Sequence, residues 1–272
     1  HVTKGIYASG NDFIYNSGAI KLDINGFANS TNSGYDSIGI FGYNSTIDLK
    51  QIEMNFIDTS GTVHNLDVYG IKTYASGVVK IGDDSKIGNV SGLDSNNQPN
   101  VMKGMYAGDN ATMDSGIIEV GDNLELNVIN AGTGWTYGID SYDGATISVG
   151  DGLRLFVTGG KDTRGVEVGF NDAKVTLGEN ASIIANSRDG VALGVFVFNK
   201  GKFEAAKDLV INVSADDGSQ WAAGVLAQGT GSEAVLNGAV ISATEGSTAS
   251  YAIYTYNNGS VVGNAGKYNI YG

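Results

Sequence analysis

A pair made of glycine and an apolar residue recurs along this 272-residue chain at intervals of 27 to 34 residues. Such pairs start at Gly5, Gly39, Gly70, Gly104, Gly138, Gly165, Gly194 and Gly224, and in a ninth copy Ala252 replaces the glycine. We call these nine positions the anchors. Repetition at a near-constant period of this length is typical of stacked repeat proteins. The repeat therefore constrains the fold more than any other feature of the sequence.

One repeat consists of three short segments in which apolar and polar residues alternate, as in residues 137–142, 145–150 and 153–158. Alternation with a period of two is typical of β-strands. The dipeptides Asp143-Gly144 and Asp151-Gly152, which separate the segments, are turn signals. Because no segment has a helical period, the repeat folds that contain helices are excluded.

Three strands in about thirty residues predict an all-β fold, a right-handed parallel β-helix of about nine three-stranded coils. Residues 1–272 then form a single domain. The residue after each anchor is always apolar, and the residue three after it is usually small, so both columns are expected to face inward. The pattern is interrupted at His1 and Gly272 without an obvious cap. We therefore expect a fragment of a longer protein.

Composition excludes several classes of function. The chain has no cysteine, which excludes disulfides and thiolate metal sites. Its formal net charge of −13 argues against nucleic acid and anionic membranes as partners. No apolar stretch is long enough to span a bilayer, so we expect no membrane insertion by this segment.

The copies of the form Tyr-Gly-Ile…Ile-x-Val-Gly-Asp-x-Leu-x-Leu-x-Val, as in residues 137–157, resemble the passenger repeats of bacterial autotransporters. That family uses type V secretion and has a β-helix related in shape to pectate lyases. The resemblance covers nearly the whole chain and lies in the style of the repeat, without a catalytic motif. It implies an extracellular location, on a Gram-negative cell surface or secreted, and a role in adhesion or self-association.

Residues for catalysis are scarce. The only histidines are His1 and His64, and no Gly-x-Ser-x-Gly motif accompanies them. A site of the pectate-lyase type needs a basic residue beside carboxylates, but Arg154, Arg164 and Arg188 share no repeat column. We therefore predict no catalytic residues and no enzyme activity.

Acidic residues recur at the predicted corners. Asp109 and Asp143 both lie five residues after their anchors, in adjacent coils, where two carboxylates could share a proton or a cation. Four more follow a glycine at a strand end: Asp83, Asp122, Asp151 and Glu179. Such stacked carboxylates could bind Ca²⁺ weakly, but the glycine-rich nonapeptide of calcium-binding β-rolls is absent. We predict solvated turns, with no metal and no cofactor.

Aromatic residues are concentrated at the positions two and four residues after the anchors, which should point outward. Ten of these eighteen positions hold Tyr or Phe, against 9% in the whole chain. Trp135 and Trp221 lie three residues before their anchors, in predicted loops that open onto the same sheet. The predicted ligand-binding residues are Tyr7, Phe41, Tyr43, Tyr74, Tyr106, Tyr142, Phe196, Phe198, Tyr254, Tyr256, Trp135 and Trp221. An aromatic surface of this kind suits a binding role.

Three hypotheses follow from these observations. The first is an adhesin that recognises a glycan or protein on a host or bacterial surface through the outward aromatic residues. The second is a structural stalk or self-associating body, in which the aromatic rings form a ladder that stabilises the sheet or is covered by a loop. The third is a carbohydrate-active enzyme of pectate-lyase shape. We favour the first.

Overall fold

The computed structural model describes residues 3–25, 36–57, 67–91, 101–108, 115–130, 133–216, 221–244, 249–263 and 266–271. These residues form β-strands, all paired in parallel, in a parallel β-solenoid. The described part of the chain contains no helix that could cross a membrane.

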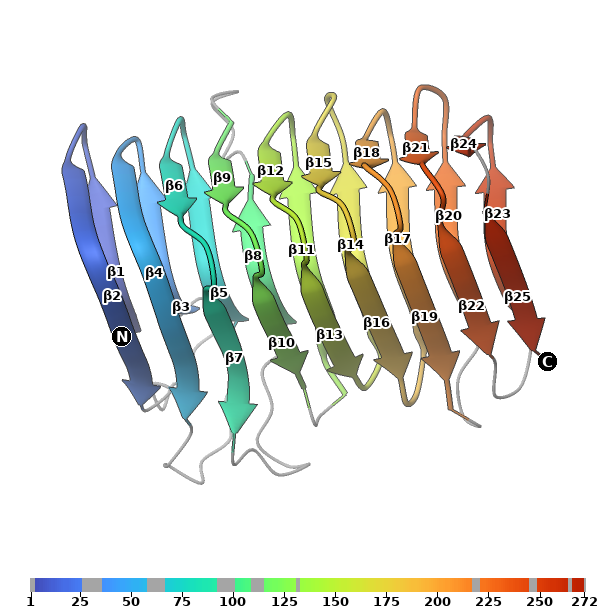
Figure 1. Cartoon of the computed structure of the whole chain (residues 1–272), viewed down its shortest axis with the longest axis horizontal. Coiled ribbons are helices and arrows are strands. Elements are labelled where there is room, and N and C mark those ends of the chain that lie inside the picture. Colours follow the sequence, from blue (N-terminus) through green and yellow to red (C-terminus); the bar gives the residue numbers. More distant parts are fainter. Residues whose placement is uncertain are drawn as a thin grey trace.

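The first side of the solenoid is a nine-strand sheet in which each strand pairs with the corresponding strand of the next turn. Its strands are β1 (Thr3–Ser9), β3 (Asp36–Tyr43), β5 (Asp67–Tyr74), β8 (Val101–Ala107), β11 (Trp135–Tyr142), β14 (Asp162–Gly169), β17 (Val191–Phe198), β20 (Trp221–Gln228) and β23 (Ser250–Tyr256). In Figure 1 these strands follow one another along the long axis of the molecule.

A sixteen-strand sheet forms the other two sides. The second side has short strands: β6 (Val78–Ile81), β9 (Ile117–Val120), β12 (Thr146–Val149), β15 (Lys174–Leu177), β18 (Lys202–Ala205), β21 (Glu233–Leu236) and β24 (Ser260–Gly263). The third side has β7 (Lys86–Ser91), β10 (Glu125–Ile129), β13 (Arg154–Gly159), β16 (Ser182–Ser187), β19 (Val210–Ala215), β22 (Val240–Thr244) and β25 (Lys267–Tyr271). The long strand β4 (Thr46–Ile57) pairs with both β6 and β7, and β2 (Phe13–Asn25) pairs with β4.

The strand order gives seven turns of three strands, from β5–β7 to β23–β25 (Figure 1). In the two turns before them, β2 and β4 each run on without a break where later turns have a corner. The prediction of a parallel β-helix is therefore confirmed, whereas the count of nine three-stranded coils is not. The hand of the solenoid stays a prediction.

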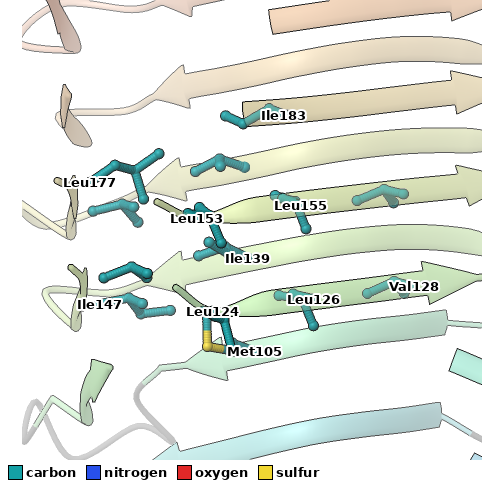
Figure 2. Packing of buried hydrophobic residues seen from close by; sticks show 14 of the residues in the cluster. Met105, Leu124, Leu126, Val128, Ile139, Ile147, Leu153, Leu155, Leu177 and Ile183 are labelled. Atoms are coloured by element: carbon teal, nitrogen blue, oxygen red, sulfur yellow. The ribbon is translucent and has the colours of Figure 1, made fainter. Parts of the chain in front are cut away.

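The core is a column of aliphatic side chains enclosed by the three sides. Ile139 on β11 aligns with Met105 and Val166 on the neighbouring strands, and all three are fully buried. In Figure 2, Leu126 and Leu155 from the third side project into the same interior. Each large aliphatic side chain buried in this way contributes about 1.5–3 kcal/mol. The inward columns one and three residues after the anchors were thus predicted correctly for the central turns.

The anchor glycines are required because two chain segments approach each other closely inside the solenoid. A Cβ atom on Gly138 would lie 2.6 Å from the Gly165 carbonyl oxygen and 2.7 Å from a methyl group of Leu155. Gly104 faces the same contacts one turn earlier. Ala252 lies on β23, the last strand of this sheet. No following rung of the described sheet faces it, so the methyl group is tolerated.

Carboxylates at the corner between the second and third sides bind the backbone of the next turn. The Asp83 Oδ1 atom accepts a hydrogen bond from the Asp122 amide (2.9 Å), and Asp122 accepts one from Asp151 (2.8 Å). Asp151 in turn accepts one from Glu179 (2.7 Å). The prediction that these corners are merely solvated was therefore incomplete, because the three aspartates join successive turns. Among the described residues, no group of three or more Asp, Glu, His or Cys side chains could hold a metal ion.

The corner between the first and second sides contains asparagines in the left-handed conformation. Asn11, Asn44, Asn171, Asn199, Asn257 and Asn258 all have positive φ. Asn171 also donates a hydrogen bond from Nδ2 to Oδ1 of Asp143 (3.0 Å). Asp109, the proposed carboxylate partner of Asp143, lies outside the described residues, as does His64.

Candidate functional site

The outward side of the nine-strand sheet carries the predicted ligand-binding residues. We call it the aromatic face and define it by the side chains that lie one residue before each anchor and two and four residues after it. Strand pairing aligns each of these three columns from turn to turn. Successive members of a column are therefore about 4.8 Å apart.

The column one residue before the anchors also faces outward, although simple alternation along the strand did not predict this. The side chains of Tyr137 and Asp140 both point outward, although the two residues are three positions apart. Lys103 contacts both of them, since its Nζ atom lies over the Tyr137 ring and forms an ion pair with Asp140. Strict alternation would place them on opposite sides. The outward direction of both is possible because Gly138 and Ile139 both face the core. The column comprises Lys4, Ile38, Tyr69, Lys103, Tyr137, Arg164, Leu193, Ala223 and Tyr251.

The twelve predicted residues differ widely in exposure. Five are exposed: Tyr7 (49%), Tyr43 (41%), Trp135 (37%), Tyr254 (36%) and Tyr256 (51%). Six are half-buried: Phe41, Tyr74, Tyr106, Tyr142, Phe198 and Trp221. Phe196 is buried in a small apolar cluster with Leu193, Ala223 and Leu226. Only part of the predicted set therefore presents an open ring surface.

Trp135 and Trp221 do not lie in loops, contrary to the sequence-based expectation. They are the first residues of β11 and β20, and Trp221 aligns with Val191 on β17. Trp135 contacts Tyr137 with a ring-centroid distance of 6.2 Å, and Trp221 contacts Tyr254 at the same distance. Both tryptophans are thus part of the sheet and extend the aromatic face toward the start of its strands.

The aromatic rings contact one another between turns. Tyr7 stacks on Phe41 with a centroid distance of 5.6 Å, and Tyr74 packs edge-on against both Phe41 (6.2 Å) and Tyr106 (5.5 Å). Contacts of this kind contribute about 0.5–1.5 kcal/mol each beyond the burial of area. The rings therefore form ladders along the solenoid, as expected if this chain is a structural stalk. The outer surface of the same ladders is also aromatic.

Cations lie over the rings. The Lys4 Nζ atom is 3.8 Å from the centroid of Tyr7, and Lys72 is 3.8 Å from that of Tyr69. Lys103 is 4.1 Å from that of Tyr106. The Arg164 guanidinium lies 5.0 to 5.4 Å from the rings of Phe196, Trp135 and Tyr137. Each such contact is attractive, and the attraction is stronger where the cation is partly buried.

Carboxylates neutralise most of these cations. Lys72 binds Asp36 (2.5 Å), Lys103 binds Asp140 (2.5 Å), and Arg164 binds both Glu167 and Asp162. Among the described residues, Lys4 forms no ion pair. We call these ion pairs of Lys72, Lys103 and Arg164 the ionic row. The row was not evident from the sequence, although Lys72, Asp140 and Glu167 occupy the predicted outward column two residues after the anchors.

Burial perturbs several of these groups. It raises the pKa of Glu167 to about 7, and the neighbouring Asp140 carboxylate adds to the increase, whereas Arg164 opposes it. Burial also lowers the pKa of Lys72 although the hydrogen bond to Asp36 opposes this change. The Oδ1 atom of Asp140 is buried and has no hydrogen-bond partner among the described residues. The centre of the face is therefore a tightly packed ionic cluster.

A hollow of about 270 Å³ lies at the beginning of the face, over strands β1, β3 and β5. It is lined by Lys4, Asp36, Ile38, Phe41, Tyr43, Lys72 and Tyr74. The hollow thus brings together three of the predicted aromatic residues, Lys4, which forms no ion pair with a described residue, and the Lys72–Asp36 ion pair. Aromatic rings beside charged hydrogen-bonding groups suit the apolar and polar faces of a sugar ring, or a mixed protein surface.

No protein-family model, curated protein or solved structure matches the chain.

Proposed function

We propose that this chain is part of a secreted or surface-located bacterial adhesin that binds a glycan or protein on a host or bacterial cell through the aromatic face. The observation that carries the proposal is the hollow over β1, β3 and β5, where Phe41, Tyr43 and Tyr74 lie beside Lys4. The exposed ring of Tyr43, beside the half-buried rings and the polar groups, suits a recognition site.

The repeating geometry of the face supports binding of an extended ligand. Similar groups recur about every 4.8 Å along the axis, so a polymeric or multivalent partner could contact several turns at once. Contacts of this kind are individually weak, but linking them raises the overall affinity. The function needs recognition only, without covalent chemistry.

A structural stalk or self-associating body remains the second candidate. It is favoured by the ring contacts between turns, such as Tyr7 with Phe41, since contacts of this kind add to the stability of a sheet. Tyr43 separates the two candidates, because it is exposed and makes no ring contact with a described residue. Its exposure is therefore not explained by the ladder.

The carbohydrate-active alternative has one observation in its favour, the pair Asp140 and Glu167 beside Arg164. The Asp140 side chain is only 2% exposed and that of Glu167 only 7%. A glycosidic oxygen could reach neither group without displacing its neighbours. We therefore rank adhesion above catalysis.

The test is binding of the labelled chain to an array of host glycans and matrix proteins, compared with the variants Tyr43→Ala and Phe13→Ala. Phe13 is the matched control, because it is an exposed aromatic residue on β2, outside the aromatic face. We expect a specific hit that Tyr43→Ala weakens and Phe13→Ala leaves intact, with unchanged melting temperatures. Absence of any hit together with concentration-dependent oligomers would favour the stalk. A hit that is insensitive to Tyr43→Ala would place recognition elsewhere.

A further inference from the structure

A second hollow, of about 660 Å³, lies on a different side of the solenoid from the aromatic face. It is formed by the second side and its corner with the third side, where β4 meets the turn of β6 and β7. The residues that matter for its chemistry are Tyr15, Asp48, Lys50, Lys80, Asp83 and Glu119.

The hollow exists because the corner changes shape between two turns. Leu49 on β4 pairs with Ile81, and Glu53 pairs with Lys86, so three residues of β4 lie opposite four residues of the next turn. The extra residue lets the corner 82–85 stand out as a wall beside the flatter β4. Gly82 donates a backbone hydrogen bond to the Leu49 carbonyl oxygen (2.9 Å), and the Gln51 side chain donates one to the Asp84 carbonyl oxygen (3.0 Å). This wall is therefore fixed by the backbone.

One column of aligned side chains lines the hollow on the second side of the solenoid. Tyr15 pairs with Asp48, Asp48 with Lys80, and Lys80 with Glu119, each on the next strand. Tyr15 is 62% exposed, so its ring is an open platform. Lys80 and Glu119 bind each other (2.7 Å). The column thus places an aromatic platform, a carboxylate and an ion pair at successive steps of about 4.8 Å.

Two charged groups at the hollow are available to a ligand. Neither Asp48 nor Lys50 forms an ion pair with a described residue. The Asp48 carboxylate lies next to the Tyr15 platform in the column, and Lys50 lies two residues further along β4. A hydrogen-bond acceptor and a donor therefore accompany the ring.

The chemistry of the lining selects among ligand classes. The wall and floor carry four carboxylates (Asp48, Asp83, Asp84 and Glu119) and two amines (Lys50 and Lys80), an excess of negative charge that disfavours acidic ligands. An apolar ligand would leave these charged groups desolvated. A pyranose ring fits both features, since its C–H face packs on an aromatic ring while its hydroxyls bind carboxylates and amines. We propose that this hollow binds a short oligosaccharide that carries no acidic groups.

The proposal is tested by calorimetric titration of the intact chain with three trisaccharides: N-acetylglucosamine, glucosamine and galacturonic acid oligomers. We expect saturable binding of the first two and binding of the galacturonate at least about tenfold weaker. The variant Tyr15→Ala should weaken binding about tenfold, whereas Tyr15→Phe should retain it. Phe13→Ala is the matched control, because Phe13 is an exposed aromatic residue on the same strand and does not line the hollow.

The proposal would be overturned by no saturable binding of any trisaccharide, by preference for the galacturonate, or by equal losses in Tyr15→Ala and Phe13→Ala. The variant Tyr43→Ala separates this site from the aromatic face, since it should leave the titration unchanged. If array binding survives Tyr15→Ala while the titration shows nothing, the second site fails and the adhesin proposal stands. Loss of the titrated binding in Tyr43→Ala but not in Tyr15→Ala would assign the saccharide to the aromatic face.

Discussion

Asp140 on β11 and Glu167 on β14 are paired neighbours on adjacent parallel strands, and both point outward from the solenoid. Both are nevertheless almost closed to solvent. The Asp140 Oδ1 atom lacks a hydrogen-bond partner among the described residues, and the Asp140 carboxylate adds to the rise in the pKa of Glu167. This pair therefore couples the stability of the sheet to pH.

We predict that the free energy of unfolding falls as the pH rises through about 7, and that Glu167→Gln removes most of this fall. The charged groups and rings around Glu167 are Asp140 and Tyr137 on β11, Arg164 and Asp162 on its own strand, Lys103 on β8, and Phe196 on β17. Burial, then Asp140, raises its pKa from 4.5 in the unfolded chain to about 7 in the folded chain. The folded state therefore holds this proton more tightly, so the stabilisation is complete below about pH 4.5 and lost above about pH 7.

The measurement is chemical denaturation at about pH 5 and about pH 8, where the difference should be on the order of 2 to 3 kcal/mol. Glu119→Gln is the control, because Glu119 forms an exposed ion pair with Lys80. Equal pH dependence in the wild type and Glu167→Gln would contradict the prediction.

Lys103→Met should destabilise the chain more than the double change Lys103→Met with Asp140→Leu. The single variant leaves the Asp140 carboxylate buried without its cation, at a cost of about 3–5 kcal/mol. The double variant replaces the pair by apolar side chains in a partly apolar surrounding, which is often nearly neutral. A double-mutant cycle from denaturation curves measures the coupling, and strictly additive effects would show that the pair is not coupled.

The sequence contained enough information for the fold because each turn repeats the same steric requirement. Ile139 could be placed inward and aligned with Met105 and Val166, because every anchor is followed by an apolar residue. An added Cβ atom on the glycine before each of them would lie within 2.6 Å of a carbonyl oxygen of the next turn. The number of three-stranded turns could not be predicted in the same way. The early turns keep the anchors but have long strands, β2 and β4, in place of a strand, a corner and a second strand.

The ionic row could not be predicted because its partners come from different columns. Lys103 lies before its anchor, whereas Asp140 lies after the anchor of the next turn, 37 residues away. Placing Lys103 outward requires the knowledge that Gly104 and Met105 both face the core, which breaks the simple alternation. Whether an outward ring is open or covered also depends on its neighbours, as the contrast between Tyr43 and Phe196 shows.

Asp122→Ala should lower the stability by about 1 kcal/mol, and Asp122→Asn should restore most of it. The Asp122 Oδ1 atom accepts the Asp151 amide hydrogen bond (2.8 Å), and a typical net contribution of one such bond is about 0.5–1.5 kcal/mol. Asparagine keeps the acceptor oxygen without the charge. Thermal denaturation with and without millimolar Ca²⁺ checks this, and a Ca²⁺-dependent stabilisation that Asp122→Asn abolishes would instead show that this corner binds the cation.

Gly138→Ala should destabilise the solenoid by about 1–3 kcal/mol or more, because the added methyl group overlaps groups from two sides of the core. It would lie 2.6 Å from the Gly165 carbonyl oxygen, which the strand pairing holds in place, and 2.7 Å from Leu155. Gly18→Ala is the matched control, since at that exposed position on β2 the nearest atom to an added Cβ is 3.4 Å away. The comparison is the midpoint of denaturation of both variants with the wild type. If Gly138→Ala unfolded at the same midpoint as Gly18→Ala, the close approach at the anchors would not be what restricts these positions to glycine.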